Sequence, residues 1–322
     1  MTMREFYPMK VVALAGGVGG SKLVDGLAQL LPPEDFCVIV NTGDDFEHLN
    51  LMISPDLDTV CYTLADLANP GTGWGIRDDS WHTMEAIVDL DGPGWFRLGD
   101  KDLATHLVRT SRLKAGESLS EITRGFCQKW GIQNAVYPMS DEPVRTIVHT
   151  VSGEALGFQE YFVHQASQPI VRSFEFKGID QAKPVPAALE AIKNCDLVIF
   201  APSNPWVSID PILAVSGYRS AIAQKPVVAV SPLIGGKALK GPAAKMYEEL
   251  GVYPSASAVA NHYRDLLSGF ILDHADENDL DKIERWRIIS LVTDIIMKDQ
   301  QDRVRLARET LEFCRSILNR SR

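Results

Sequence analysis

Residues 10–24 read KVVALAGGVGGSKLV, in which a short apolar run leads into a glycine-rich loop. The run at 10–14 is rich in β-branched residues, which predicts a buried parallel strand. Leucines at 23, 27, 30 and 31 then lie on one face of a helix, which a Pro-Pro pair ends. Residues 36–40, FCVIV, predict a second buried strand. This order indicates an α/β fold with a doubly wound, mostly parallel Rossmann-like sheet.

The rest of the chain extends this core. Further apolar runs predict buried strands at 197–200, 227–230 and 288–292, and a C-terminal helix with an apolar stripe over 304–318. Residues 1–69 and 191–322 are therefore expected to form the Rossmann-like nucleotide- and phosphate-binding core. Residues 70–190 mix helical and strand-like patterns, and we expect an inserted α+β subdomain that covers the active site. Ligands of open α/β sheets bind where strands end, so the segments after the strands are the candidate site.

Composition restricts the class of partner. The 322 residues carry a net charge of −10, which argues against nucleic-acid binding and against binding to an anionic membrane surface. The five cysteines form no C-x-x-C pair, and no apolar run reaches membrane-spanning length. We therefore expect a reduced, cytoplasmic protein whose partners are small molecules.

The glycine loop GGVGGSK fits neither common nucleotide motif. A P-loop places Lys directly after the last Gly, but Ser21 intervenes here, and G-x-G-x-x-G requires a glycine at the position of Lys22. Glycines between a strand and a helix still let the backbone approach an anion, and helix N-terminal N–H groups attract it. The candidate phosphate-binding residues are Gly17, Gly19, Gly20 and Lys22. The alternative is a tight turn without a ligand.

Four carboxylates follow the second strand: Asp44 and Asp45, then Asp56 and Asp58. Next to a phosphate-binding loop they indicate Mg²⁺, which binds one or two carboxylates together with water and substrate oxygens. Asp44, Asp45 and Asp56 are the candidate ligands, and the sequence does not decide among them. The alternative is that Asp56 or Asp58 caps the helix that follows, although capping does not explain both pairs.

Other candidates lie farther along the chain. Asp100 and Asp102 flank Lys101 at a predicted helix start, where acids favour the helix dipole. Ser203 and Asn204 in APSNPW are suited to bind a base or ribose, and Gly235 belongs to a second glycine-rich loop. The alternative for each is an ordinary turn. The seven histidines show no zinc spacing, and we expect most of them to be structural.

Eight short motifs occur in the order found in one enzyme family. They are GGVGGSKL, VNTGDD, SPDLDTV.YTL, WGIRDDS, RLGDKDLATHLVR, PMSDEPVRT, APSNP..SIDPIL and AVSPLIGGKALKGPAAKM. In these motifs the chain resembles the 2-phospho-L-lactate transferases of coenzyme F-420 biosynthesis, and the resemblance extends over nearly its whole length. The chain departs from the family pattern at GGVGGSK, where some members carry a Thr-containing loop. This difference bears on the contacts to the substrate that donates the transferred group.

The resemblance implies an Mg²⁺-dependent transferase that is a homodimer. It moves a phospho-hydroxyacid from a guanosine diphosphate ester to the deazaflavin 7,8-didemethyl-8-hydroxy-5-deazariboflavin and releases GMP. It also implies that Asp58 and Lys101 bind the deazaflavin. We expect Asp45, Asp58 and Lys101 to serve catalysis, with Asp58 orienting the acceptor hydroxyl and Asp45 on the metal.

Two other readings remain. Gluconeogenesis factors, which bind nucleotide sugars and resemble the family at the glycine loop, suggest a regulatory protein. The interpretation as an NAD-dependent dehydrogenase rests only on Gly17-Val18-Gly19, and it gives the acidic residues no role. The sequence does not indicate which hydroxyacid the donor carries: phospholactate, phosphoenolpyruvate or phosphoglycerate.

Overall fold

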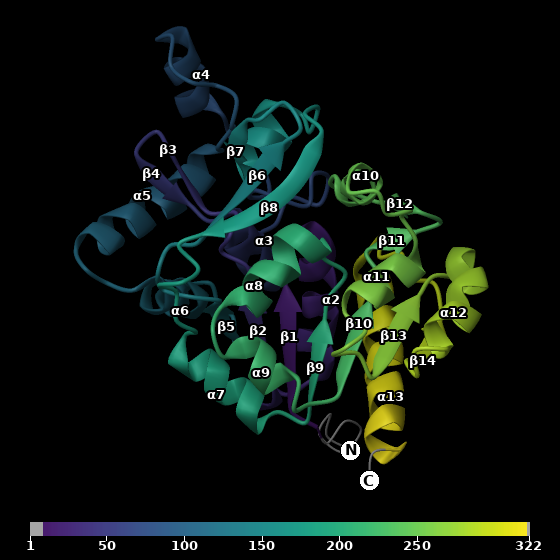
Figure 1. Ribbon diagram of the computed structural model, residues 1–322. Coiled ribbons are helices and arrows are strands. Elements are labelled where there is room, and N and C mark those ends of the chain that lie inside the picture. Colours follow the sequence, from purple (N-terminus) through teal and green to yellow (C-terminus); the bar gives the residue numbers. More distant parts are fainter. Residues whose placement is uncertain (1–8, 321–322) are drawn as a thin grey trace.

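The computed structural model describes residues 9–320 and is built around one parallel sheet of seven strands (Figure 1). In spatial order these are β14 (Ile289–Val292), β13 (Gly269–Leu272), β10 (Val227–Val230), β9 (Leu197–Phe200), β1 (Val11–Ala15), β2 (Phe36–Val40) and β5 (Ala135–Pro138). The chain runs outward from β1 to β2 and β5 on one side, and from β9 to β14 on the other. The strand order therefore reverses between β1 and β9, where such sheets bind ligands. The expected doubly wound fold is confirmed.

Helices cover both faces of the sheet because alternate residues of its strands point to opposite sides. Val11, Ala13 and Ala15 of β1 belong to one core, and Val12 and Leu14 belong to the other. The first core includes α2 (Gly17–Leu30), α3 (Pro55–Leu64), α6 (Leu119–Lys129) and α13 (Gln300–Arg320). The second includes α7 (Pro186–Asn194), α8 (Asp210–Ala214), α9 (Tyr218–Ile222), α10 (Ala243–Glu249), α11 (Ala256–His262) and α12 (Leu280–Glu284).

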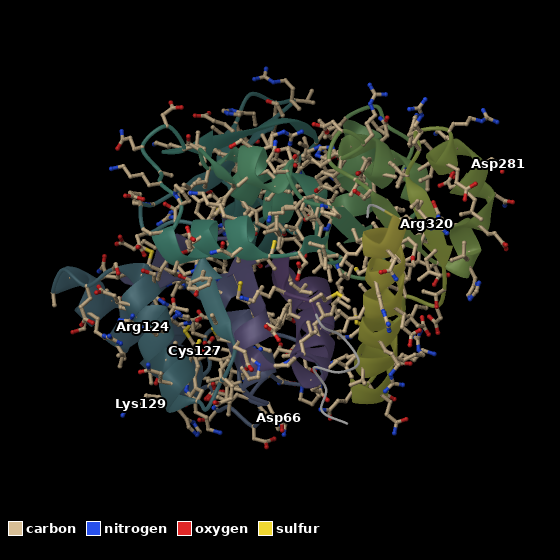
Figure 2. The ribbon with its side chains drawn as sticks, turned by 90° about the horizontal axis from the view of Figure 1, so that it is seen from below. Asp66, Arg124, Cys127, Lys129, Asp281 and Arg320 are labelled. Atoms are coloured by element: carbon tan, nitrogen blue, oxygen red, sulfur yellow. The ribbon has the colours of Figure 1, made fainter. Side chains whose placement is uncertain are left out.

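Smaller elements gather above the carboxyl ends of the central strands (Figure 1). They are the hairpins β3 (Phe46–His48) with β4 (Leu51–Ile53) and β11 (Leu233–Ile234) with β12 (Lys237–Ala238), the sheet of β7 (Ala155–Gly157), β6 (Arg145–Thr150) and β8 (Val171–Lys177), and the helices α4 (His82–Asp89) and α5 (Asp100–Lys114). Charged side chains such as Lys129, Asp281 and Arg320 point outward from the ribbon (Figure 2).

The structure differs from the expected segment boundary in one respect. Residues 70–190 supply the three-stranded sheet, but they also supply β5, which pairs with β2 in the central sheet. The strand is short, half-buried and ends at Pro138, and proline is tolerated there because β5 lies at the sheet edge. A four-residue edge strand of this kind lacks the apolar run that marks the inner strands.

Two further observations concern the whole described chain. All five cysteines are free thiols, and all are buried. Between residues 9 and 320, every helix is too short or too polar to cross a membrane.

Candidate active site

A cavity of about 570 Å³ lies at the carboxyl ends of the central strands, which is within the size range of small-molecule sites. Its floor is formed by residues that follow β1, β2, β9 and β10, among them Gly17, Asp44, Ser203 and Ser231. Phe158, Gln159, Phe162, Val163 and the β11–β12 hairpin also line it. The Gly16 N–H donates to Ser203 Oγ at 3.1 Å, which joins the loops after β1 and β9 at the point where the strand order reverses.

The glycine loop is compressed against the segment that follows β9. Gly17 opens α2 with a φ of +63°, a conformation that favours glycine. A Cβ atom at Gly19 would lie 2.4 Å from the carbonyl oxygen of Pro202, and one at Gly20 would lie 2.5 Å from Ser203 Oγ. Gly17, Gly19 and Lys22 line the cavity, whereas Gly20 is buried and does not line it. The sequence GGVGG is therefore required by packing here, which leaves main-chain groups facing the cavity.

Asp56 connects this loop to the first turn of α3. Its Oδ1 accepts the Gly17 N–H at 2.8 Å, and its Oδ2 accepts from Asn41 Nδ2 at 2.9 Å. Asn41 also donates to the Val207 carbonyl and accepts the Gly43 N–H, so it fixes the turn after β2. The N-cap of α3 is Ser54, so neither Asp56 nor Asp58 caps the helix. Asn41 was not singled out from the sequence, because two of its partners, Asp56 and Val207, lie 15 and 166 residues away.

Asp44 lies beside Asp56 at the cavity wall. Burial, followed by the nearby Asp56 carboxylate, raises the pKa of Asp44 well above its usual range, and burial also raises the pKa of Asp56. The Oδ1 atom of Asp44 is buried and has no hydrogen-bond partner among residues 9–320. Two buried carboxylates this close, one of them with an oxygen that lacks a partner, would be stabilised by a cation.

The pair of carboxylates suits Mg²⁺ better than a metal whose ligands all come from the protein. Within residues 9–320, His, Cys, Asp and Glu do not group in threes or more as a protein-only metal site requires. Mg²⁺ needs only one or two carboxylates and completes its shell with water and phosphate oxygens. Asp44 and Asp56 fit this requirement.

Asp45 lies behind this pair and does not line the cavity. Ser54 Oγ donates to its Oδ2 at 2.8 Å, and its Oδ1 is buried without a partner in the described part of the chain. Burial raises the pKa of Asp45 to about 7, although Arg145 and the Ser54 hydroxyl lower it. Its assignment as a metal ligand and catalytic residue stays a prediction.

Asp58 forms a bidentate ion pair with Arg109 of α5. Arg109 Nη1 lies 3.0 Å from Asp58 Oδ2, and Nη2 contacts Oδ1. Arg109 is only 1% exposed, so its side of the pair is buried, whereas Asp58 lines the cavity. Arg109 was missed in the sequence because nothing in a helix of mixed charge indicates a partner 51 residues away.

The same network continues along α5. Arg109 Nη1 lies 3.1 Å from His106 Nδ1, and His106 Nε2 lies 3.2 Å from Asp102 Oδ1, at an angle outside that of a regular hydrogen bond. Tyr62 of α3 donates to the same Oδ1 at 2.7 Å. Asp102, His106 and Tyr62 all line the cavity. The sequence reading of Asp102 as a dipole-stabilising acid, and of the histidines as structural, therefore overlooked a polar wall of the site.

The remaining candidates have mixed positions. Ser203 and Asn204 line the cavity. Lys101 does not line it, and its Nζ donates to the carbonyls of Arg77 and Asp78. The Gly235 N–H donates to the Asp276 carboxylate, and Gly235 is also outside the lining. The roles of Lys101 and Gly235 stay predictions without support from the cavity.

Aromatic rings form a further part of the cavity lining, here called the aromatic wall. Trp74, Phe96, Phe158 and Phe162 line the cavity, and the rings of Phe158 and Phe162 are stacked with centroids 5.5 Å apart. Flat apolar walls of this kind favour a planar ring system in the ligand.

Comparisons with known proteins identify the family. The family model of the 2-phospho-L-lactate transferase CofD matches residues 11–311. The chain is 42% identical over 316 residues to a phosphoenolpyruvate transferase of Streptomyces griseus, covering 96% of this chain and 99% of that protein. It is 39% identical over 316 residues to a 2-phospho-L-lactate transferase of Methanopyrus kandleri, with the same coverage.

A solved structure shares the fold alone. A UPF0052 family member from Bacillus halodurans aligns with a TM-score of 0.64 at 16% identity, covering 94% of this chain and 98% of that one. The family model spans nearly the entire sheet and both candidate loops. The chain belongs to the 2-phospho-L-lactate transferase family.

Proposed function

We propose that this protein transfers a phospho-hydroxyacid from its guanosine diphosphate ester to 7,8-didemethyl-8-hydroxy-5-deazariboflavin, with Mg²⁺ and release of GMP, in coenzyme F-420 biosynthesis. The observation that carries the proposal is that one cavity brings the glycine loop together with Asp44 and Asp56. Transfer of a phosphoryl-type group depends mainly on positioning and on neutralising charge, and this arrangement supplies both.

The donor diphosphate fits between the start of α2 and the two carboxylates. Helix-start N–H groups and the ammonium of Lys22, which lines the cavity, offer donors to phosphate oxygens. In this structure Lys22 Nζ donates to the Met297 carbonyl at 2.6 Å, so it is already held at the cavity wall. Bound Mg²⁺ would neutralise diphosphate charge, and Asp44 and Asp56 are the residues that would hold it.

The guanosine is expected along Ser203 and Asn204, which line the cavity on the β9 side. The deazaflavin is expected against the aromatic wall, with Asp58 near its hydroxylated chain. Trp74 and Phe96 lie in the segments that lead to α5, and Phe158 and Phe162 belong to the subdomain above. This placement separates the planar acceptor from the charged donor.

The acid carried by the donor stays open among phospholactate, phosphoenolpyruvate and phosphoglycerate. The relatives in the comparison carry the names of two of these activities, at 42% and 39% identity, which is too small a difference to choose between them. We further propose a cytoplasmic homodimer. A regulator that binds nucleotide sugars is the alternative that the test must exclude.

The test incubates the purified protein with the deazaflavin and each of the three guanylated donors, with Mg²⁺ or with excess EDTA. Chromatography measures GMP, and mass spectrometry identifies the deazaflavin product. We expect GMP and product in equal amounts with at least one donor, and neither in EDTA. No product with any donor, together with binding of a UDP-sugar, would support the regulator instead.

A further inference from the structure

Asp58 and Asp102, the two carboxylates that contact the network of Arg109 and His106, differ in the partners of their oxygen atoms. Both oxygens of Asp58 are engaged by Arg109. Both contacts of the Asp102 carboxylate go to Oδ1, and Oδ2 has no hydrogen-bond partner among the described residues. Asp102 is 8% exposed and lines the cavity. Only Asp102 therefore presents an oxygen without a partner.

We propose that Asp102 is the catalytic residue that takes the proton of the acceptor hydroxyl, and that His106 and Tyr62 are positioning residues that act through it. This inference rests on the proposed transfer function. It assigns the proton to a residue of α5, and it leaves Asp58 as a charged anchor paired with Arg109.

Asp102 is held in place from two elements. Tyr62 of α3 donates its hydroxyl proton to Oδ1 at 2.7 Å, and His106 lies one turn along α5 with Nε2 at 3.2 Å from the same atom. Tyr62 is 1% exposed and His106 is also 1% exposed, so neither partner moves freely. Fixing one oxygen in this way leaves the other in a defined direction, as a proton acceptor requires.

Arg109 determines the tautomer of His106. A guanidinium has only donors, so the contact of Arg109 with His106 Nδ1 at 3.1 Å requires that this nitrogen accept. The ring proton is then on Nε2, which faces Asp102. Burial opposes ionisation of Asp102, but His106, Tyr62 and Arg109 outweigh it and lower its pKa. Asp102 is therefore ionised near neutral pH and can accept a proton.

This wall adjoins the donor site through α3. Asp56 contacts the Gly17 N–H, and Asp58, two residues later in the same helical turn, joins the network of Arg109 and His106. The proposal therefore places the acceptor hydroxyl beside Asp102, in the same cavity as the glycine loop and the two carboxylates.

The acceptor O–H bond breaks as its oxygen bonds to the phosphorus that carries the hydroxyacid, and the proton passes to Asp102 Oδ2. The bond between this phosphorus and the bridging oxygen breaks, and that oxygen leaves with GMP. The proton on Asp102 returns to water when the products depart.

The test compares Asp102→Asn with the wild-type protein, using the donor that the wild type turns over. We expect kcat to fall about 100-fold or more, the usual contribution of a general base, while the KM for deazaflavin changes less than about threefold. Asp102→Glu keeps a carboxylate and is expected to recover part of the lost kcat. Tyr62→Phe removes only the orienting hydroxyl and is expected to lower kcat about fivefold, a small part of that contribution.

Asp25→Asn is the matched control, because the Asp25 side chain is 13% exposed, close to the 11% of Asp102, and it pairs with Arg303 away from the cavity. It is expected to keep wild-type kcat. Asp102→Asn with kcat within tenfold of the wild type would overturn the inference. If that variant does not fold, wild-type kcat in Tyr62→Phe would overturn it. Absence of GMP release from the wild type would reject the proposed function as well.

Discussion

Asp56 Oδ1 accepts the backbone N–H of Gly17 at 2.8 Å, so the first turn of α3 is tied directly to the start of α2. The contact brings a carboxylate to the place where a helix start attracts anions. Asp56 also takes a hydrogen bond from Asn41 and lies beside Asp44. A cation held by the two carboxylates would therefore lie next to any phosphate bound at the glycine loop.

Asp44→Asn tests the metal half of this arrangement. The amide keeps the shape of the side chain but removes its charge, so Mg²⁺ loses one of its two carboxylates. We expect kcat at saturating substrate to fall by about 100-fold, comparable to losing a key electrostatic group. Mg²⁺ titration of GMP release measures it, with Asp25→Asn as the control. If GMP release by Asp44→Asn depended on the Mg²⁺ concentration as in the wild type, Asp44 would not be a metal ligand.

Gly19→Ala tests the glycine loop. The added Cβ would lie 2.4 Å from the Pro202 carbonyl oxygen, so the loop must move away from the segment after β9. Overpacking of this kind costs about 1–3 kcal/mol of the free energy of unfolding, and we expect the KM for the donor to rise as well. Urea unfolding and steady-state kinetics measure the two effects.

Gly157→Ala is the control for this change, since a Cβ at Gly157 meets no atom within 4 Å. It is expected to retain the wild-type KM for the donor. Equal effects of the two substitutions would mean that close packing of the glycine loop is not what positions the donor.

Arg109→Leu tests the buried pair with Asp58. The substitution leaves an unpaired carboxylate in a site where Arg109 is 1% exposed, and breaking a buried pair costs about 3–5 kcal/mol of the free energy of unfolding. Arg219→Leu breaks the pair with Asp265, whose side chains are 48% and 58% exposed, and is expected to cost at most about 1 kcal/mol. Urea unfolding of both variants decides the matter, and equal losses would contradict the burial argument.

Asp45→Asn tests the protonation of the inner carboxylate. Burial raises the pKa of Asp45 to about 7, whereas an unfolded Asp titrates near 3.9. The folded protein thus holds a proton that the unfolded chain loses, and this stabilisation, full below about pH 4, is lost as the pH rises through about 7.

The measurement is the free energy of unfolding in EDTA at pH 5 and pH 8. The stability of the wild type relative to Asp45→Asn is expected to be lower at pH 8, because asparagine mimics the protonated carboxyl at every pH. The same difference between the two proteins at both pH values would show that the pKa of Asp45 is not raised.

The sequence predicted five strands of the central sheet, the edge strand β14 among them, and missed β5 and β13. The apolar runs of β9 and β10 coincide with the observed strands because a parallel strand buried on both faces needs a continuous apolar run. The edge strand β5 lacks such a run. β13, which was also missed, begins at Gly269, where a Cβ would lie 2.4 Å from Ile317 of α13. Gly269 therefore allows α13 to pack closely against the strand, and it does not form a turn.

The candidate site could also be predicted only in part from the sequence. The glycine loop and the acidic turn were predicted as site segments because the fold class places both at one edge of the sheet, and both line the cavity. Asn41, Arg109 and His106 were not found as site residues, because their significance lies in contacts with Asp56, Asp58 and Asp102 on other turns and helices. A single residue that belongs to no recognisable motif does not reveal, in one sequence, which distant residues it contacts.

A crystal structure with Mn²⁺, GDP and the deazaflavin tests the central claim most directly. The anomalous signal of Mn²⁺ is predicted to lie between Asp44 and Asp56, with the diphosphate against the main-chain N–H groups of Val18 and Gly19. A diphosphate bound outside this cavity, or a metal peak away from both carboxylates, would contradict it.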